Sequence, residues 1–83
     1  MKIQVHTTPG CMQCRTLMRK LDKSGVAYDV INLEQHPELV EQLKELGLTQ
    51  APIVTTEGFS FTGFRPDKIK ELERRYKREK PDA

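Results

Sequence analysis

The chain is short, densely charged and nearly neutral overall. It has 83 residues, of which 36% are hydrophobic and 31% charged, and its formal net charge is +2. A chain of this length can form one hydrophobic core and therefore one domain. The small net charge argues against a nucleic-acid partner. The basic residues near the C-terminus alternate with glutamates, as on a solvated helix face, which is favoured here over a phosphate-binding patch.

No targeting segment is recognisable in the sequence. The first residues lack the basic, apolar and small-residue regions of a secretory signal, and no apolar run approaches the roughly 20 residues that cross a bilayer. We therefore expect a cytoplasmic monomer with no membrane partner. In that compartment, two cysteines are more often catalytic or metal-binding than a structural crosslink.

The N-terminal part of the sequence predicts a strand followed by a helix. Polar and apolar residues alternate over residues 2–7, which indicates a strand. Residues 8–10, Thr-Pro-Gly, break it. From about residue 12 to residue 24, apolar side chains recur at spacings of three and four on one helix face: Cys14, Leu17, Met18 and Leu21. Gly25 is placed to end this helix in the left-handed conformation.

The next part predicts a second strand and a second helix. Residues 27–33 are rich in β-branched and aromatic side chains, which favours a strand. Pro37 suits the first position of a short helix over residues 37–46. One face of that helix carries four apolar residues: Leu39, Val40, Leu43 and Leu46. Because a helix joins the first two strands, we expect them to be parallel through a right-handed crossover.

The C-terminal part predicts a hairpin and a last helix. Residues 51–56 and 59–62 are two short strands around the turn Glu57-Gly58. The helix starts near Pro66 and turns three apolar residues inward: Ile69, Leu72 and Tyr76.

These elements define one domain. Their order is β-α-β-α-β-β-α, which predicts an α/β fold with a four-stranded mixed sheet flanked by three helices. We assign residues 1–78 to this domain and residues 79–83 to a flexible charged tail.

The segment Cys11-Met12-Gln13-Cys14 carries the chemistry that the sequence suggests. It follows a strand, comes after a Pro-Gly turn and opens a helix. Cys11 therefore falls at the helix N-terminus, where free backbone N–H groups and the helix dipole favour a reactive thiolate. Cys14 lies one turn further along, on the core side and within bonding reach of the first sulfur. We predict a redox-active disulfide, in which Cys11 attacks a target disulfide and Cys14 resolves the mixed disulfide.

Two alternatives remain for the cysteine pair. A structural disulfide would close a very small loop and would stabilise the fold little on the chain-entropy account. A zinc site needs four ligands, and the further candidates, His6 and His36, lack the spacing of a second ligand pair. We expect both histidines to be surface or strand-end residues, and we predict no metal ligand and no bound cofactor.

Pro52 is the second informative position. It follows Ala51 at the start of a predicted strand, where a proline leaves no ladder hydrogen bond unmade. The position fits a simple junction between loop and strand, and it also fits a cis-proline packed beside the dithiol. The pattern alone leaves both open.

The residues described so far resemble one family. The element order, the C-x-x-C motif at the first helix and the X-Pro before the third strand are similar to the thioredoxin fold at glutaredoxin size. The segments CMQC, TQAPIV and FTGFRPDKI resemble the NrdH-redoxins, glutaredoxin-like proteins that pass electrons to ribonucleotide reductase. The resemblance covers roughly residues 2–76, and the stretch Gly-Phe-Arg-Pro-Asp at residues 63–67 is its most discriminating part.

The resemblance implies partners and a binding surface. Pro52 would be cis beside the sulfurs, and the Ala51 backbone would pair with an incoming peptide. Thioredoxin reductase, supplied by NADPH, would reduce the disulfide in place of glutathione. Glutathione-using relatives carry a Gly-rich stretch and an acidic residue near the last helix, whereas Phe64 and Arg65 occupy that region here. Phe64 would add to an apolar docking surface, and Arg65 would bond to nearby loop groups. The other partner-binding residues that the resemblance implies are Met12, Gln13 and Gly63.

Two positions depart from the family pattern. Phe61-Thr62 stands where the family has Trp-Ser, so an indole N–H donor is lost and Phe61 is expected in the core. His6 stands at a family tyrosine and places a titratable group within a few residues of Cys11. Two rival functions stay open on the sequence: a glutathione-dependent glutaredoxin, and a metal- or cluster-binding module.

Overall fold

The computed structural model describes residues 1–79. The bounds of its elements are β1, Gln4–Thr7; α1, Met12–Lys23; β2, Asp29–Asn32; a 3-10 helix η1, Leu33–Gln35; α2, Pro37–Glu45; β3, Ile53–Thr56; β4, Phe59–Thr62; and α3, Pro66–Glu79. The predicted order of strands and α-helices is confirmed. The predicted tail falls mostly on residues 80–83, outside the described residues, so its boundary stays a prediction; Glu79 is the last residue of α3. No helix within residues 1–79 is long and apolar enough to cross a membrane.

The four strands form one mixed sheet in the order β2-β1-β3-β4. β1 pairs in parallel with β2 and antiparallel with β3, and β3 pairs antiparallel with β4. The parallel pairing expected of the first two strands is thus confirmed. Because β1 lies between two partners, the loop that follows it starts from a strand held on both edges.

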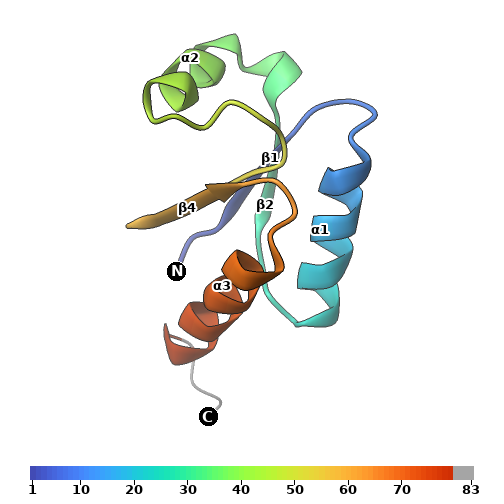
Figure 1. The fold of residues 1–83 in the computed structure, drawn as a ribbon, viewed down its shortest axis with the longest axis vertical. Helices are drawn as coiled ribbons and strands as arrows, with labels where there is room; N and C mark the ends of the chain where they lie inside the picture. Colours follow the sequence, from blue (N-terminus) through green and yellow to red (C-terminus); the bar gives the residue numbers. More distant parts are fainter. Residues whose placement is uncertain (80–83) are drawn as a thin grey trace.

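The helices cover the two faces of the sheet unequally. In Figure 1, α1 and α3 lie on one side of the strands, and α2 lies on the other side, at the top of the view. The main core fills the α1 and α3 side, and its buried members are Ile3, Val5, Leu17, Leu21, Val26, Val54, Phe61, Ile69 and Leu72. A smaller cluster lies towards α2, with the buried members Leu33, Leu43 and Ile53. Phe61 is 4% exposed, so its predicted place in the core is confirmed.

Two segments are shorter than the sequence predicts: the second strand and the second helix. The second strand begins at Asp29 and gives way to η1 at Leu33, so it is shorter than residues 27–33. Leu46, which the sequence groups with the apolar face of the second helix, lies just beyond the end of α2 and is 71% exposed. Leu46 is the C-cap of α2, and Gly47, with a φ of 78°, turns the chain away directly after it.

The prediction that both histidines lie at the surface or at a strand end is wrong for His6. This residue is 3% exposed and stands in register with Ile31 and Ile53 on the sheet. Its Nε2 is 3.1 Å from the Thr55 hydroxyl, while its buried Nδ1 has no hydrogen-bond partner among the described residues. Burial lowers the pKa of the His6 imidazole, which favours the neutral ring. His36 lies at the surface as expected, 3.4 Å from a Glu38 carboxylate oxygen.

Candidate functional site

The cysteine pair lies on the turn that joins the central strand to α1. Gly10, with a φ of 74°, bends the chain, and the Cys11 N–H donates to the Thr8 carbonyl at 3.4 Å. Cys11 has an extended backbone and is the N-cap of α1. The Cys14 N–H donates to the Cys11 Sγ at 3.1 Å. The sulfur thus occupies the position that a serine or aspartate oxygen takes at most helix starts, where the backbone N–H groups and the helix dipole favour negative charge.

The two sulfurs are joined, and their surroundings differ. A disulfide connects Cys11 and Cys14, whose Cα atoms are 5.3 Å apart, within the ordinary range for such a bond. Cys14 is 2% exposed and belongs to the buried face of α1, whereas Cys11 is only half-buried. Within residues 1–79, no group of three or more His, Cys, Asp and Glu side chains is placed to hold a metal ion.

Three of the predicted residues come together from separate parts of the chain: Gln13, Pro52 and Gly63. The Ala51–Pro52 peptide bond is cis, as one of the two alternatives from the sequence requires, and the packing of Pro52 beside the dithiol stays a prediction. The Pro52 carbonyl accepts a hydrogen bond from the Gly63 N–H at 2.8 Å. A Cβ atom built on Gly63 would lie 3.9 Å from the Gln13 Oε1. The hydrogen bond and this close approach therefore connect the segment before β3, the segment after β4 and the first turn of α1.

Phe64 and Arg65 follow Gly63 and lead into α3. Phe64 is half-buried and packs against the main core. The Arg65 carbonyl accepts the Ile69 N–H at 2.8 Å, and its exposed guanidinium lies 3.5 Å from an Asp67 carboxylate oxygen. Both partners, Asp67 and Ile69, belong to α3, so the expected bond between Arg65 and nearby loop groups stays a prediction. Met12 is 71% exposed beside Cys11.

Two hollows border these segments, and sequence reasoning found only one residue of each. The first lies towards α2 and is lined by Thr8, Pro9, Leu33, Glu34, Val40, Thr49 and Ala51. The second lies against α1 and is lined by Thr16, Arg19, Lys20, Lys23 and Phe64. The recurrence of basic residues along residues 15–23 was a visible signal for the second hollow. The first hollow depends on loops far apart in the sequence, and no local pattern indicates it.

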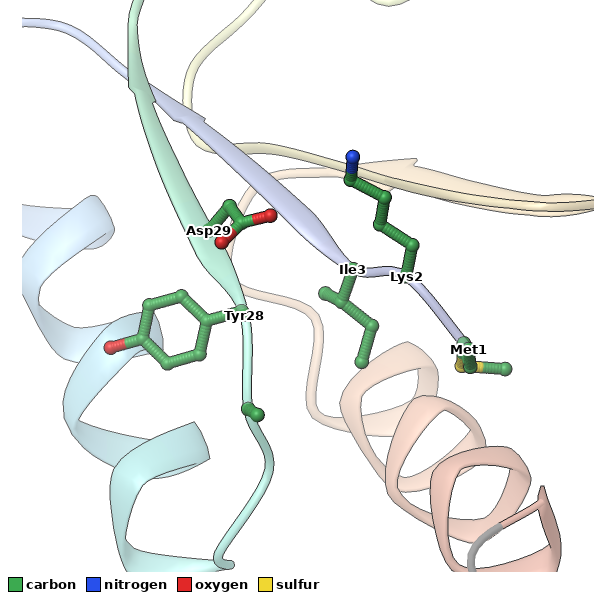
Figure 2. Close-up of a pocket in the computed structure, with 6 residues that line it drawn as sticks. Met1, Lys2, Ile3, Tyr28 and Asp29 are labelled. Atoms are coloured by element: carbon green, nitrogen blue, oxygen red, sulfur yellow. The ribbon is translucent and has the colours of Figure 1, made fainter.

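A wider hollow of about 480 Å³ lies at the other end of β1. Figure 2 shows Lys2, Tyr28 and Asp29 at its rim, with their polar ends pointing in different directions. The Tyr28 hydroxyl is already used, because it donates to Asp22 at 2.9 Å and lies 3.3 Å from the Met18 carbonyl. This hollow therefore offers no converging set of reactive groups.

Comparisons with known proteins agree with this geometry. A family model described as Glutaredoxin matches residues 3–60. The chain is 37% identical over 70 residues to the glutaredoxin-like protein NrdH of Lactococcus lactis subsp. lactis, covering 84% of this chain and 97% of that protein. It is 36% identical over 72 residues to the NrdH of Escherichia coli K12, covering 87% and 89%. The solved structure of E. coli NrdH-redoxin superposes with a TM-score of 0.82 over 87% of this chain and 95% of that one.

The fold and the site together define a thiol–disulfide oxidoreductase with a thioredoxin fold, in which a C-x-x-C pair opens the first helix. The chain belongs to the glutaredoxin family and, within it, to the NrdH redoxins.

Proposed function

We propose that this protein is a cytoplasmic, monomeric dithiol carrier that reduces a disulfide of ribonucleotide reductase and is re-reduced by thioredoxin reductase with electrons from NADPH. The observation that carries the proposal is the unequal setting of the two sulfurs. Cys11 is half-buried and receives the Cys14 N–H, whereas Cys14 is 2% exposed. A partner disulfide therefore has better access to Cys11.

Each sulfur has its own part in the reaction. In the reduced protein, the Cys11 thiolate attacks one sulfur of the target disulfide, which forms a mixed disulfide and releases the other target sulfur as a thiolate. The Cys14 thiolate then attacks the Cys11 sulfur, which releases the second target thiolate and forms the Cys11–Cys14 disulfide. Two electrons pass from the dithiol to the target. Thioredoxin reductase reverses the oxidation by supplying two electrons and two protons to the Cys11–Cys14 disulfide.

The segments around the disulfide supply the surface for the partner. We assign the Ala51 backbone to main-chain pairing with the incoming peptide, and Pro52 to the wall beside it. Met12 and Phe64 contribute apolar area, since Met12 is 71% exposed and Phe64 is half-buried. The remaining assigned residues shape the first turn of α1 and the connection to α3: Gln13, Gly63 and Arg65.

The connection between β4 and α3 supports thioredoxin reductase over glutathione as the source of electrons. Phe64 packs against the core there. The acidic residue in this region, Asp67, pairs with Arg65, so its carboxylate is not free to hold glutathione. The E. coli relative is described as having a thioredoxin-like activity profile, which supports the same assignment.

The choice of reductant provides the decisive test. Oxidised protein is mixed either with NADPH and bacterial thioredoxin reductase or with glutathione, glutathione reductase and NADPH. Reduction of an added protein disulfide is monitored through the consumption of NADPH. We expect turnover with thioredoxin reductase and little with glutathione. Turnover with glutathione alone would replace the proposal by a glutathione-dependent glutaredoxin.

Serine variants of the two cysteines test the division of labour. Cys11→Ser is expected to abolish reduction, because no nucleophile remains for the first attack. Cys14→Ser is expected to accumulate a mixed disulfide with the target, visible as a mass increase that dithiothreitol removes. Multiple turnovers by Cys11→Ser would contradict the assigned roles.

A further inference from the structure

The outer face of α1 carries positive charge that the rest of the described chain leaves uncompensated. Arg15, Arg19 and Lys23 recur every four residues and are exposed, so they form one stripe along the helix. None of the three has an ion-pair or side-chain hydrogen-bond partner within residues 1–79. Lys20 differs, because its Nζ is 3.9 Å from a Glu73 carboxylate oxygen.

This stripe borders the hollow that Phe64 lines, which is called the groove below. The hollow has a volume of about 180 Å³ and is lined by Thr16, Arg19, Lys20, Lys23 and Phe64. The Thr16 hydroxyl already donates to the Met12 carbonyl at 3.1 Å, so it needs no ligand. Along α1, the exposed Met12 comes directly after Cys11, and Arg19 and Lys23, which line the hollow together with Phe64, lie further along the helix. Apolar surface near the sulfur is therefore followed by positive charge further away.

Charge is distributed unevenly across the molecule. α1 has four basic residues and one acidic residue, whereas α2 has three acidic residues and one basic residue. The hollow on the α2 side includes Glu34. Because the net charge is only +2, this separation, rather than the total charge, decides which way an acidic partner would approach.

We propose that the groove between α1 and Phe64 binds an acidic segment of the protein whose disulfide is reduced. An apolar residue next to the target cysteine lies against Met12 and Phe64, and acidic residues beyond it pair with Arg19 and Lys23. The inference rests on the proposed function, since it names the kind of segment that the reduced dithiol receives.

The length of the stripe favours a polypeptide over glutathione. Lys23 is twelve residues beyond Cys11, which corresponds to about 18 Å along a helix. A fully extended tripeptide spans at most about 11 Å, so glutathione bonded to Cys11 does not reach the end of the stripe. A segment of a protein chain reaches it easily. A nucleic acid or an anionic membrane would match the charge but supplies no disulfide for the dithiol to reduce.

Synthetic peptides test the inference. Each peptide carries one cysteine as a mixed disulfide with thionitrobenzoate, followed by a leucine and then by a run of aspartates, glutamines or lysines. Reduced Cys11 attacks the peptide sulfur and releases thionitrobenzoate, which is followed by absorbance, and Cys14 then releases the peptide thiol. We expect the second-order rate constant of thionitrobenzoate release for the aspartate peptide to exceed that for the glutamine peptide by about tenfold at low salt and to approach it at high salt.

Charge-reversed variants locate the effect. Arg19→Glu/Lys23→Glu is expected to reverse the preference and favour the lysine peptide. Lys2→Glu/Arg78→Glu makes the same change in net charge at exposed sites outside the groove, so it keeps the preference for aspartate. Arg19→Gln/Lys23→Gln is expected to remove the preference without adding negative charge. This variant replaces the charge-reversed one if circular dichroism shows that the latter folds poorly.

Three outcomes would overturn the inference. They are equal rates for the aspartate and lysine peptides, an equal change in both charge-reversed variants, and stronger inhibition of aspartate-peptide exchange by single-stranded DNA than by an unreactive aspartate peptide of equal charge. Failure of the proposed function gives a different result. In that case the reductant assay shows turnover with glutathione alone, whereas the three peptides, tested with reduced protein and no reductase, still report the charge preference.

Discussion

Replacing Gly63 by alanine tests how the loop between β4 and α3 supports the site. Gly63 has a φ of 79°, a backbone conformation that residues other than glycine rarely adopt. Its N–H is held by the Pro52 carbonyl at 2.8 Å. The added methyl group meets no clash, because its nearest neighbour would be the Gln13 Oε1 at 3.9 Å. The cost of Gly63→Ala is therefore conformational rather than steric.

The magnitude follows from two opposing effects. The left-handed conformation costs a non-glycine residue about 1–2 kcal/mol, while the lower entropy of alanine in the unfolded chain offsets about 0.4–1 kcal/mol. The difference, about 1 kcal/mol, lowers the Tm of a domain of this size by about 4–8 °C. If the backbone rotates to relieve the strain, the bond to Pro52 is lost and Phe64 is displaced, so we also expect KM for the protein disulfide to rise about two- to tenfold.

Gly47→Ala provides the matched control. Gly47 has a φ of 78°, and a Cβ there would have no atom within 4 Å, but the residue follows α2 and lines neither hollow beside the dithiol. Thermal unfolding should show the same loss of stability for Gly47→Ala and Gly63→Ala, and the assay with thioredoxin reductase should show a raised KM for Gly63→Ala alone. An unchanged KM in Gly63→Ala, or a stability loss confined to Gly47→Ala, would refute this reasoning.

Four further substitutions probe the core and the titrating groups. Because burial lowers the pKa of His6, the unfolded chain takes up a proton that the folded imidazole resists; the free energy of unfolding should fall as the pH drops below about 6.5, and His6→Phe should flatten this dependence in urea titrations. Desolvation, followed by the hydrogen bond and the charge of Asp22, raises the pKa of Tyr28 to about 12. Asp22→Asn should therefore shift a phenolate transition, followed by ultraviolet absorbance, towards lower pH, and Tyr28→Phe should remove it. Phe61→Ala empties a position that is 4% exposed and should cost about 3–5 kcal/mol in denaturant unfolding, whereas a loss below about 1 kcal/mol would show that the core collapses around it.

The sequence predicted the features that depend on neighbouring residues. Apolar spacing along α1 placed Cys14 and Leu17 on the buried face, and both are buried. The start of the helix after a Pro-Gly turn placed Cys11 at or next to the helix N-terminus, and in the structure it is the N-cap. These features follow from local periodicity and turn chemistry, which a single chain segment contains in full.

Features that depend on distant pairing were missed. The burial of His6 follows from its register with Ile31 and Ile53, and register between strands far apart in the chain is not written in the pattern of β1 alone. The groove at Phe64 likewise needs the segment after β4 to fold back against α1. The basic residues of α1 are visible in the sequence. That three of them line a hollow together with Phe64 is visible only in the folded chain.

The sulfur of Cys11 is at once the reactive atom and the cap of α1, accepting the Cys14 N–H. Serine is among the residues that helices prefer at this position, so Cys11→Ser should keep the helix start and the whole partner-facing surface while losing the chemistry. Such a protein would be an inert competitor that occupies the same partners as the active form. Added in excess to a mixture of partners, it should act as a dominant inhibitor. Its inhibition constant would measure the non-covalent affinity of those partners for the redoxin, without the contribution of a sulfur–sulfur bond.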